Sequence, residues 1–173
     1  MERLPPERVV TAEKAIRHIR NGFRVFIGSA CAAPNHLIDA LAEHYRSYAD
    51  VEFRQLYATS TPRLLDPAFR DHFRYNAFCV GDVVAPALRS CAVDYTPMNL
   101  SELPRMLRRR LYPIDVALVS VTPPDDSGHV SLGLSVDVTR EAIEGAAVVI
   151  AEVNDQMPRT EGRRRIPIEA IDW

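Results

Sequence analysis

The sequence predicts an α/β domain built on an open, mostly parallel sheet that is covered by helices. Three observations lead to this prediction. Segments with strand character alternate with segments of helical periodicity along the whole chain. One strand candidate, residues 114–121, is apolar almost throughout, which is typical of a strand buried on both faces. The length of 173 residues suits one domain with a real hydrophobic core.

The first half of the chain opens with a helix and then alternates. Residues 11–21 carry apolar side chains at helical spacing, and a strand is predicted at residues 23–27. Small residues fill positions 28–34, before a second helix over 35–48 and a strand at 51–57. The following segment, with prolines at positions 62 and 67, reads as loop and then as a short helix over 66–73.

The second half continues the alternation. We expect a strand at 76–80, a short helix at 83–89, an extended piece at 93–95 and a helix at 101–110. Ser101 is predicted to cap that last helix, whose apolar face ends at Leu111. The buried strand 114–121 is followed by a rigid loop, a helix at 138–145 and a strand at 147–153. From residue 154 the chain reads as loop until Ile166.

Composition excludes several classes of function. A net charge of −2 gives no electrostatic reason to expect nucleic acid or an acidic membrane as a partner. The three cysteines form no C-x-x-C pair and the histidines show no ligand spacing, so neither a zinc nor another metal site is expected. The amino terminus lacks an apolar signal region and no apolar run could span a bilayer. We therefore expect a cytoplasmic protein with reduced thiols.

Ligands of open parallel sheets bind outside the carboxyl ends of the strands, and three predicted loops lie at such positions: 28–34, 122–133 and 154–162. The first precedes a helix, so its backbone N–H groups could cradle an anion or oxyanion. Small residues at such a turn serve equally well for close packing. No nucleotide-binding glycine fingerprint is present.

The second loop combines the rigid pair Pro123-Pro124 with Asp125 and with exposed hydroxyl groups, which suits a wall behind a ligand. Composition alone favours a proline-stiffened turn with surface aspartates. In the third loop, Arg159 and Thr160 could bind a carboxylate or a phosphate, or could tie the loop to itself.

Other candidates are weaker. Cys31 could pair with His36 or His129 as nucleophile and base, but no third group orients them, so a small buried thiol is the favoured interpretation. Glu152 reads as an ordinary glutamate at a strand end. The arginine runs 108–110 and 163–165 read as a solvated helix end and a loop, with a ligand phosphate as the alternative contact.

The three loops also carry a resemblance. The runs Phe26-Ile-Gly-Ser29, Val119-Ser-Val-Thr-Pro-Pro-Asp-Asp-Ser-Gly-His-Val-Ser-Leu-Gly-Leu-Ser-Val-Asp-Val-Thr139 and Val149-Ile-Ala-Glu-Val-Asn-Asp-Gln-Met-Pro-Arg-Thr160 resemble the acetyl-CoA hydrolase/transferase family, which includes 4-hydroxybutyrate CoA-transferases. Segments 76–81 and 94–104 resemble it as well. The likeness runs in order from Ala12 to Trp173, over nearly the whole chain.

The resemblance implies a fold of the CoA-transferase (NagB/RpiA-like) type, with residues 1–173 forming the amino-terminal domain of a two-domain CoA-transferase or acyl-CoA hydrolase. In such enzymes a glutamate of the carboxyl-terminal domain attacks the acyl-CoA thioester, and the amino-terminal domain forms one wall of the site. No residue here matches that glutamate. The resemblance therefore implies no catalytic residue in this chain, no permanently bound cofactor, and coenzyme A or acyl-CoA together with a carboxylate as substrates.

The positions that match the family's loops are expected to form the acyl-CoA and carboxylate wall. They are Gly28, Ser29, Thr122, Pro123, Pro124, Asp125, Gly128, Ser131, Gly133, Asn154, Met157, Pro158, Arg159 and Thr160. The second motif departs from the usual pattern at Thr122, where a serine is usual, and at His129, where an aromatic ring is usual. The first loop also departs from the usual run. These departures leave the acyl group and the acceptor acid open.

The expected partners are the missing carboxyl-terminal domain, in cis or in trans, and further copies of the chain in a homo-oligomer. Residues 165–173 read like the beginning of another element, so we expect the chain to be part of a longer protein. The alternative is a non-catalytic, stand-alone domain for CoA binding or assembly.

Overall fold

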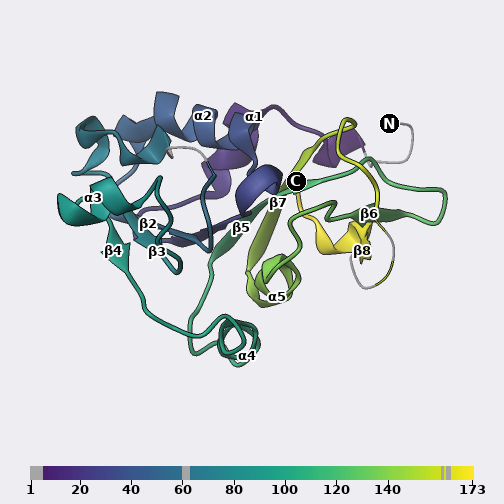
Figure 1. Ribbon diagram of the computed structural model, residues 1–173. Coiled ribbons are helices and arrows are strands. Elements are labelled where there is room, and N and C mark those ends of the chain that lie inside the picture. Colours follow the sequence, from purple (N-terminus) through teal and green to yellow (C-terminus); the bar gives the residue numbers. More distant parts are fainter. Residues whose placement is uncertain (1–5, 60–62, 161, 163–164) are drawn as a thin grey trace.

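The computed structural model describes residues 6–59, 63–160, 162 and 165–173, and its centre is a parallel sheet (Figure 1). Within this part of the chain the strands are β1 (Arg24–Ile27), β2 (Val51–Gln55), β3 (Phe73–Ala77), β4 (Asp94–Tyr95), β5 (Val116–Val121) and β7 (Val148–Val153). They lie in the order β4-β3-β2-β1-β5-β7, and every neighbouring pair is parallel. The chain builds outward from β1 in one direction and then returns to add β5 and β7 on the other side.

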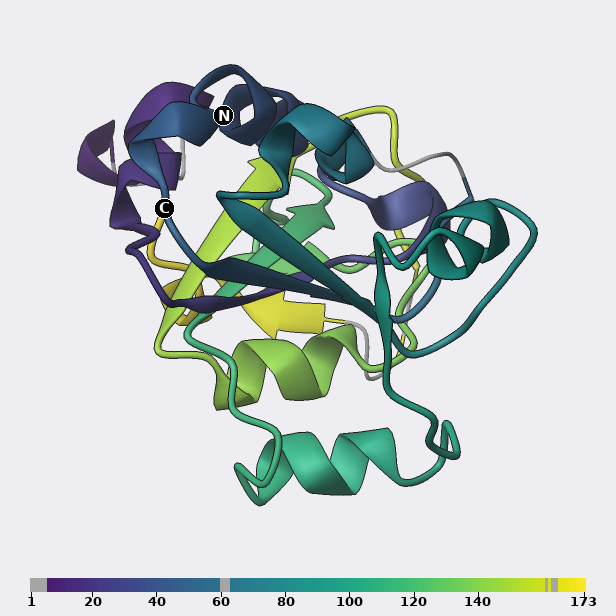
Figure 2. The ribbon, with the colours of Figure 1, turned by 90° about the vertical axis from the view of Figure 1, so that its left-hand side faces the viewer.

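Helices cover both faces of this sheet, as Figures 1 and 2 show. The helices α1 (Ala12–Ala15) and α2 (Asn35–Glu43) pack on one face, and α4 (Leu103–Arg108) and α5 (Thr139–Gly145) pack on the opposite face. A short helix, α3 (Ala85–Arg89), precedes β4. The remaining helical turns are 3₁₀ segments: Pro6–Arg8, Ile16–His18, Ala30–Ala32, Tyr45–Ser47, Arg63–Leu65, Pro67–Phe69 and Ile168–Ala170.

Strand alternation divides the core between the two helix layers. In β1, Val25 and Ile27 belong to the cluster under α1 and α2, while Phe26 belongs to the cluster under α4 and α5. Successive strand side chains point to opposite faces, so a strand covered on both sides favours apolar residues along its whole length. All six residues of β5 are buried, which confirms the prediction made from the apolar run.

A second, two-stranded sheet lies beyond β7. Strand β6 (His129–Ser131) pairs antiparallel with β8 (Arg165–Pro167), and Val130 and Ile166 are buried against the β5 and β7 side of the core. The sequence predicted loop where β6 lies, and for residues 165–173 it predicted only the beginning of another element. Strands of three residues show too little alternation to detect, and their partners are more than thirty residues apart.

Several boundaries differ from the predictions. Strand β3 covers Phe73–Ala77 rather than 76–80, because Phe73, Tyr75 and Ala77 alternate into the core. The first two helices are shorter than predicted and each ends in a 3₁₀ turn, and the predicted helix 66–73 is reduced to such a turn. Ser101 does not cap α4, which begins after Glu102, and Leu111 is exposed.

Among the described residues, no helix has the length and apolarity needed to cross a membrane.

The tightest part of the core yields a stability prediction. Phe53 on β2 is fully buried and contacts the Phe73 ring edge-on at a centroid distance of 5.0 Å. Phe53→Ala should lower the free energy of unfolding by about 3–5 kcal/mol, because it leaves a cavity in a close-packed layer. Leu111→Ala, at an exposed position, should change it by less than about 0.5 kcal/mol. Urea unfolding of both variants measures this, and equal losses would contradict the packing described.

Candidate functional site

The three predicted ligand loops lie at the same edge of the sheet. Strands β1, β5 and β7 are parallel neighbours, so the loops after Ile27, Val121 and Val153 leave from one carboxyl edge. The direction of chain progression reverses between β1 and β5. Ligands of open parallel sheets bind at such a switch point. The expectation that these loops share an edge is therefore confirmed.

The first loop is packed tightly. A Cβ atom added to Gly28 would lie 2.7 Å from the carbonyl oxygen of Ala32, which explains the glycine. The Gly28 N–H donates to the Leu118 carbonyl at 2.9 Å. Ser29 is almost fully buried, and its Oγ accepts from the Tyr57 N–H at 3.4 Å. Both residues are thus closely packed in this chain, and an anion contact of this loop stays a prediction.

A buried pair of polar side chains supports that loop from below. The Gln55 amide Nε2 donates to the Gly28 carbonyl at 2.9 Å, and the Tyr75 hydroxyl donates to the Gln55 Oε1. Burial raises the pKa of Tyr75, so its hydroxyl stays protonated and remains a donor. The Tyr75 hydroxyl, as the donor to Oε1, therefore fixes the orientation of the Gln55 amide.

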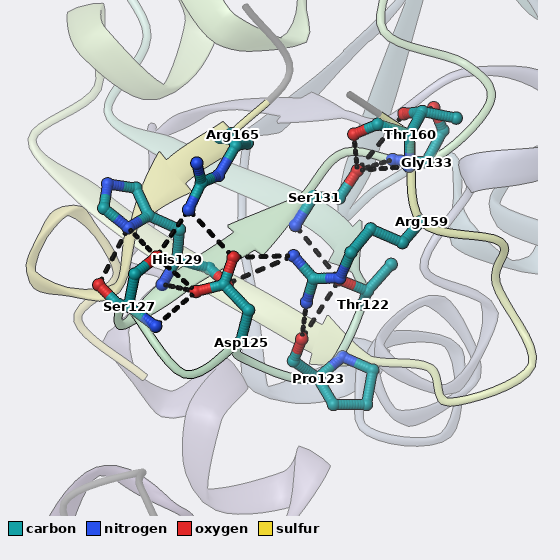
Figure 3. Close-up of polar contacts among 10 residues, drawn as sticks. All are labelled: Thr122, Pro123, Asp125, Ser127, His129, Ser131, Gly133, Arg159, Thr160 and Arg165. Carbon is teal, nitrogen blue, oxygen red and sulfur yellow. Dashed lines mark hydrogen bonds and ion pairs between the residues drawn. The ribbon is translucent and has the colours of Figure 1, made fainter. Parts of the chain in front are cut away.

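The second loop is organised around the Asp125 carboxylate. It accepts from the N–H groups of Ser127 and His129, each at 2.9 Å, and from the Ser127 hydroxyl at 2.7 Å. Two cations flank it, Arg159 at 3.2 Å and Arg165 at 3.0 Å (Figure 3). The hydrogen bonds from the His129 backbone and from Ser127, with the Arg165 charge, hold the pKa of Asp125 well below its usual range.

Arg159 ties the third loop to the second. One guanidinium nitrogen donates to Asp125 and, at 3.4 Å, to the His129 carbonyl, and the other donates to the Pro123 carbonyl. We call the set Pro123, Asp125, His129, Arg159 and Arg165 the clasp. It joins the segment after β5, the segment after β7 and strand β8 (Figure 3).

Hydroxyl groups reinforce the same junction. The Thr122 Oγ1 accepts from the Ser131 N–H at 3.0 Å, and the Ser131 Oγ accepts from the N–H groups of Gly133 at 3.2 Å and Thr160 at 3.1 Å. The Thr160 hydroxyl donates to the Gly133 carbonyl at 2.7 Å. These side chains therefore bind one another across the two loops (Figure 3).

Gly133 and Met157 show the same interlocking through packing. Gly133 has a φ of +65°, and an added Cβ would lie 2.0 Å from the Met157 sulfur. The remaining predicted residues are less constrained. Asn154 accepts from the Gln156 N–H at 2.9 Å, Gly128 has open space around it, Pro124 is half-buried and Pro158 is exposed. Their contact with a substrate stays a prediction.

Asp137 belongs to this edge but was not among the predicted site residues. It lies just before α5 with a φ of +29°, and its carboxylate accepts from the Val138 N–H and, at 3.2 Å, from the Thr139 hydroxyl. Desolvation by the surrounding protein raises its pKa, although the residue keeps contact with solvent. The sequence feature that could have indicated Asp137 is an aspartate between two valines. The structure adds that this position is strained.

Two other candidates have different surroundings from those predicted. Cys31 is exposed rather than buried, because it sits on the outward turn of the first loop, where its Sγ lies 3.1 Å from the Ser135 hydroxyl. The Glu152 carboxylate accepts from the His36 and Leu37 N–H groups at 2.8 and 3.3 Å, which places it at the amino terminus of α2. In the run 163–165, only Arg165 lies within the described residues, and it pairs with Asp125.

A cavity of about 260 Å³ lies on the outer side of β7, and mostly apolar side chains line it. It is bounded by Val121 and Val153 at the strand ends and by Trp173. None of the predicted wall residues lines this cavity. In the described part of the chain, no three His, Cys, Asp or Glu side chains gather in a group that could hold a metal.

Comparison with known proteins identifies the family. Residues 4–173 match the model of the acetyl-CoA hydrolase/transferase N-terminal domain. The chain belongs to this family. The 4-hydroxybutyrate coenzyme A transferase of Clostridium kluyveri is 38% identical over 172 residues, covering 99% of this chain. A succinyl-CoA:acetate/propanoyl-CoA:succinate CoA transferase of Fasciola hepatica is 38% identical over 159 residues, covering 91% of this chain.

Two solved structures share the fold. A 4-hydroxybutyrate CoA-transferase from Porphyromonas gingivalis superposes with a TM-score of 0.80 at 29% identity, and RipA from Yersinia pestis with 0.86 at 26%. Each covers 96% of this chain, which spans 38% and 41% of theirs. The chain also spans 40% and 33% of the two curated relatives. It corresponds to the amino-terminal part of these longer proteins.

Gly133 allows a direct test of the interlocked loops. Gly133→Ala should lower the free energy of unfolding by about 1–2 kcal/mol through its positive φ, and by about 1–3 kcal/mol more through overlap with Met157. Gly128→Ala is the matched control, since it has a φ of +74° and no neighbour within 4 Å. Met157→Ala should relieve part of the Gly133→Ala loss. Equal losses at both glycines by urea unfolding would contradict the contact.

Asp125 predicts a pH dependence. Its folded-state pKa lies below its unfolded value of about 3.9, so the ionised carboxylate stabilises the folded chain above that pH. This contribution is lost as the pH falls through and below that value. The urea midpoints of the wild type and Asp125→Asn should differ by a constant amount from about pH 7 to about pH 5, and the difference should already be smaller at about pH 3, on the way down to the low folded-state pKa. The raised pKa of Asp137 gives stability the opposite pH dependence, but this contribution is common to both proteins and cancels in the difference. A constant difference at all three pH values would contradict the assignment.

Proposed function

We propose that this chain is the amino-terminal half of an acyl-CoA:carboxylate CoA-transferase and forms one wall of its substrate site. The observation that carries the proposal is the position of the family's loop motifs. They follow β1, β5 and β7 at the edge of the sheet where the strand order reverses. The names of the relatives support the reaction class, since both that are cited above are CoA transferases.

The chemistry assigned to the whole enzyme is covalent catalysis by a carboxylate. A glutamate of the carboxyl-terminal domain attacks the acyl-CoA thioester, which releases CoA thiolate and leaves an acyl-glutamyl anhydride. The thiolate then attacks the glutamyl carbonyl and releases the acyl carboxylate, leaving a glutamyl-CoA thioester. The incoming carboxylate accepts CoA by the reverse steps, and in a hydrolase water completes the exchange.

The candidate carboxylates of this chain are unsuited to that attack. The Glu152 carboxylate is held by two backbone N–H groups, and the Asp125 carboxylate is held by three hydrogen bonds and two arginines. Donors lower the electron density available to a nucleophile, and those around Asp125 also hold its pKa down. This supports placing the nucleophile outside the 173 residues and giving this chain the role of a rigid wall.

The proposal predicts how activity divides between the halves. The 173-residue chain alone should transfer no CoA from acetyl-CoA to a carboxylate such as 4-hydroxybutyrate or succinate. Addition of a carboxyl-terminal half, in cis or as a second chain, should restore transfer at ordinary enzyme rates of about 1–1,000 s⁻¹. The measurement is release and capture of CoA, followed by a thiol reagent and by chromatography of the acyl-CoA products.

Two outcomes would contradict the proposal. Full transfer by the isolated chain would place the nucleophile within it, and the same assay on Cys31→Ala would then test the exposed thiol. Calorimetric binding of CoA without turnover, even with the second half present, would instead favour a non-catalytic CoA-binding or assembly domain.

A further inference from the structure

We propose that Arg159 and Asp125 are positioning residues, which hold the substrate wall in shape and make no contact with the phosphates of CoA. The inference rests on the proposed function and deepens it, because it separates residues that shape the wall from residues that touch the ligand. Arginine beside an acyl-CoA site would ordinarily be assigned to a phosphate. The geometry of the clasp points elsewhere.

The Arg159 guanidinium is already used within the protein. Its donors reach three acceptors: the Asp125 carboxylate, the His129 carbonyl and the Pro123 carbonyl. Two of these acceptors are backbone atoms of a proline-stiffened loop, which cannot turn away easily. A phosphate that took over this guanidinium would break all three contacts, although each acceptor keeps another partner: the Asp125 carboxylate keeps Arg165 at 3.0 Å, the His129 carbonyl keeps the Asp125 N–H at 2.8 Å and the Pro123 carbonyl keeps the Thr122 hydroxyl at 3.1 Å.

Asp125 sets the orientation of the clasp. Three hydrogen bonds from its own loop hold the carboxylate in place independently of the two arginines. The low pKa keeps it ionised at neutral pH, so Arg159 and Arg165 meet a charged acceptor on a rigid turn. Capture of the Pro123 carbonyl then fixes the direction in which the chain leaves β5. The second loop begins at this end of β5, at the switch point of the sheet.

The clasp requires the planar fork of arginine. Pro123 and Asp125 are reached by different nitrogens of one guanidinium, whereas a lysine ammonium is a single point on a flexible stem. Lysine binds phosphate well as a point charge. Arg159→Lys therefore distinguishes the two roles, since it should preserve a phosphate contact and break the clasp.

The experiment uses the complete two-domain protein and two acyl donors, acetyl-CoA and acetyl-pantetheine, which lacks the nucleotide and its phosphates. Arg159→Ala and Arg159→Lys should each lower kcat/KM by about ten- to hundredfold, because displaced loops misplace the reacting groups. The loss should be equal for both donors. Arg74→Ala is the matched control: it removes an arginine that pairs with the exposed Asp50 and, at 3.8 Å, with Glu52, which keeps its ion pair with Arg54, so both values should stay unchanged.

A double-mutant cycle tests whether Arg159 acts through Asp125. Asp125→Asn keeps the shape of the side chain and removes its charge. If the two residues work as one unit, the double variant Asp125→Asn/Arg159→Ala should be no worse than the more damaging single variant. Losses that multiply would overturn the proposal. So would a loss confined to acetyl-CoA that Arg159→Lys restores, since that pattern marks a direct phosphate contact.

Failure of the proposed function is distinguishable from failure of this inference. If the complete wild-type protein transfers CoA from no acyl donor, the function is wrong, and the clasp is then tested by stability alone. The same cycle on the urea-unfolding equilibrium constant should show coupling of at least about threefold between Asp125 and Arg159. Independent effects of the two substitutions would overturn the clasp itself.

Discussion

The parallel pairing of β1 with β5 is the contact on which the rest of the domain depends. Val25, Phe26 and Ile27 lie beside Val116, Ala117 and Leu118, although about ninety residues separate them in the chain. At the amino end, the Asp115 carboxylate accepts from both the backbone and the side chain of Arg24. At the carboxyl end, Gly28 donates to Leu118. One strand pair is thus secured at both ends, and its carboxyl end is the switch point of the sheet.

That pairing also explains why polar groups concentrate where they do. The centre of the sheet is covered on both faces, so β5 is apolar except at Ser120, and the buried polar side chains of β2 are paired, as in the ion pair of Glu52 and Arg54 at 2.7 Å. At the carboxyl edge the chain leaves the core, and loops must satisfy their own backbone groups. The hydroxyl groups of Thr122, Ser131 and Thr160 do so for one another.

Sequence patterning predicted the elements that bury long apolar runs, and missed those that depend on distant partners. The strands around Val25, Phe53, Leu118 and Ile150 were found because their composition is sufficient evidence by itself. The β6–β8 pair was missed because Val130 and Ile166 become a strand pair only when the loops after β5 and β7 have folded. Cys31 was predicted to be buried from the usual behaviour of free thiols, but the turn of the first loop carries it outward.

The same distinction applies to the candidate site. The positions of the three loops followed from the strand order, which hydrophobic periodicity can suggest. The roles of the side chains depend on three-dimensional contacts that residue spacing in the sequence does not reveal. Arg159 reads equally well as a phosphate ligand or as a structural cation until the carbonyls of Pro123 and His129 are placed beside it. Nothing in the sequence indicated that the Ser29 hydroxyl of the first loop hydrogen-bonds to the Asp137 carboxylate.

The family motif takes on a different meaning once its side chains are placed. Contacts join the members of the motif to one another: Thr122, Asp125, Ser131, Gly133, Met157, Arg159 and Thr160. The polar atoms of this motif bind other parts of the protein, so under the proposed function we expect the motif to shape the substrate wall. Under the same proposal, we expect discrimination among acyl groups and acceptor acids to come from exposed groups at this edge, such as Asp137, Cys31 and Leu134, and from the other half of the site.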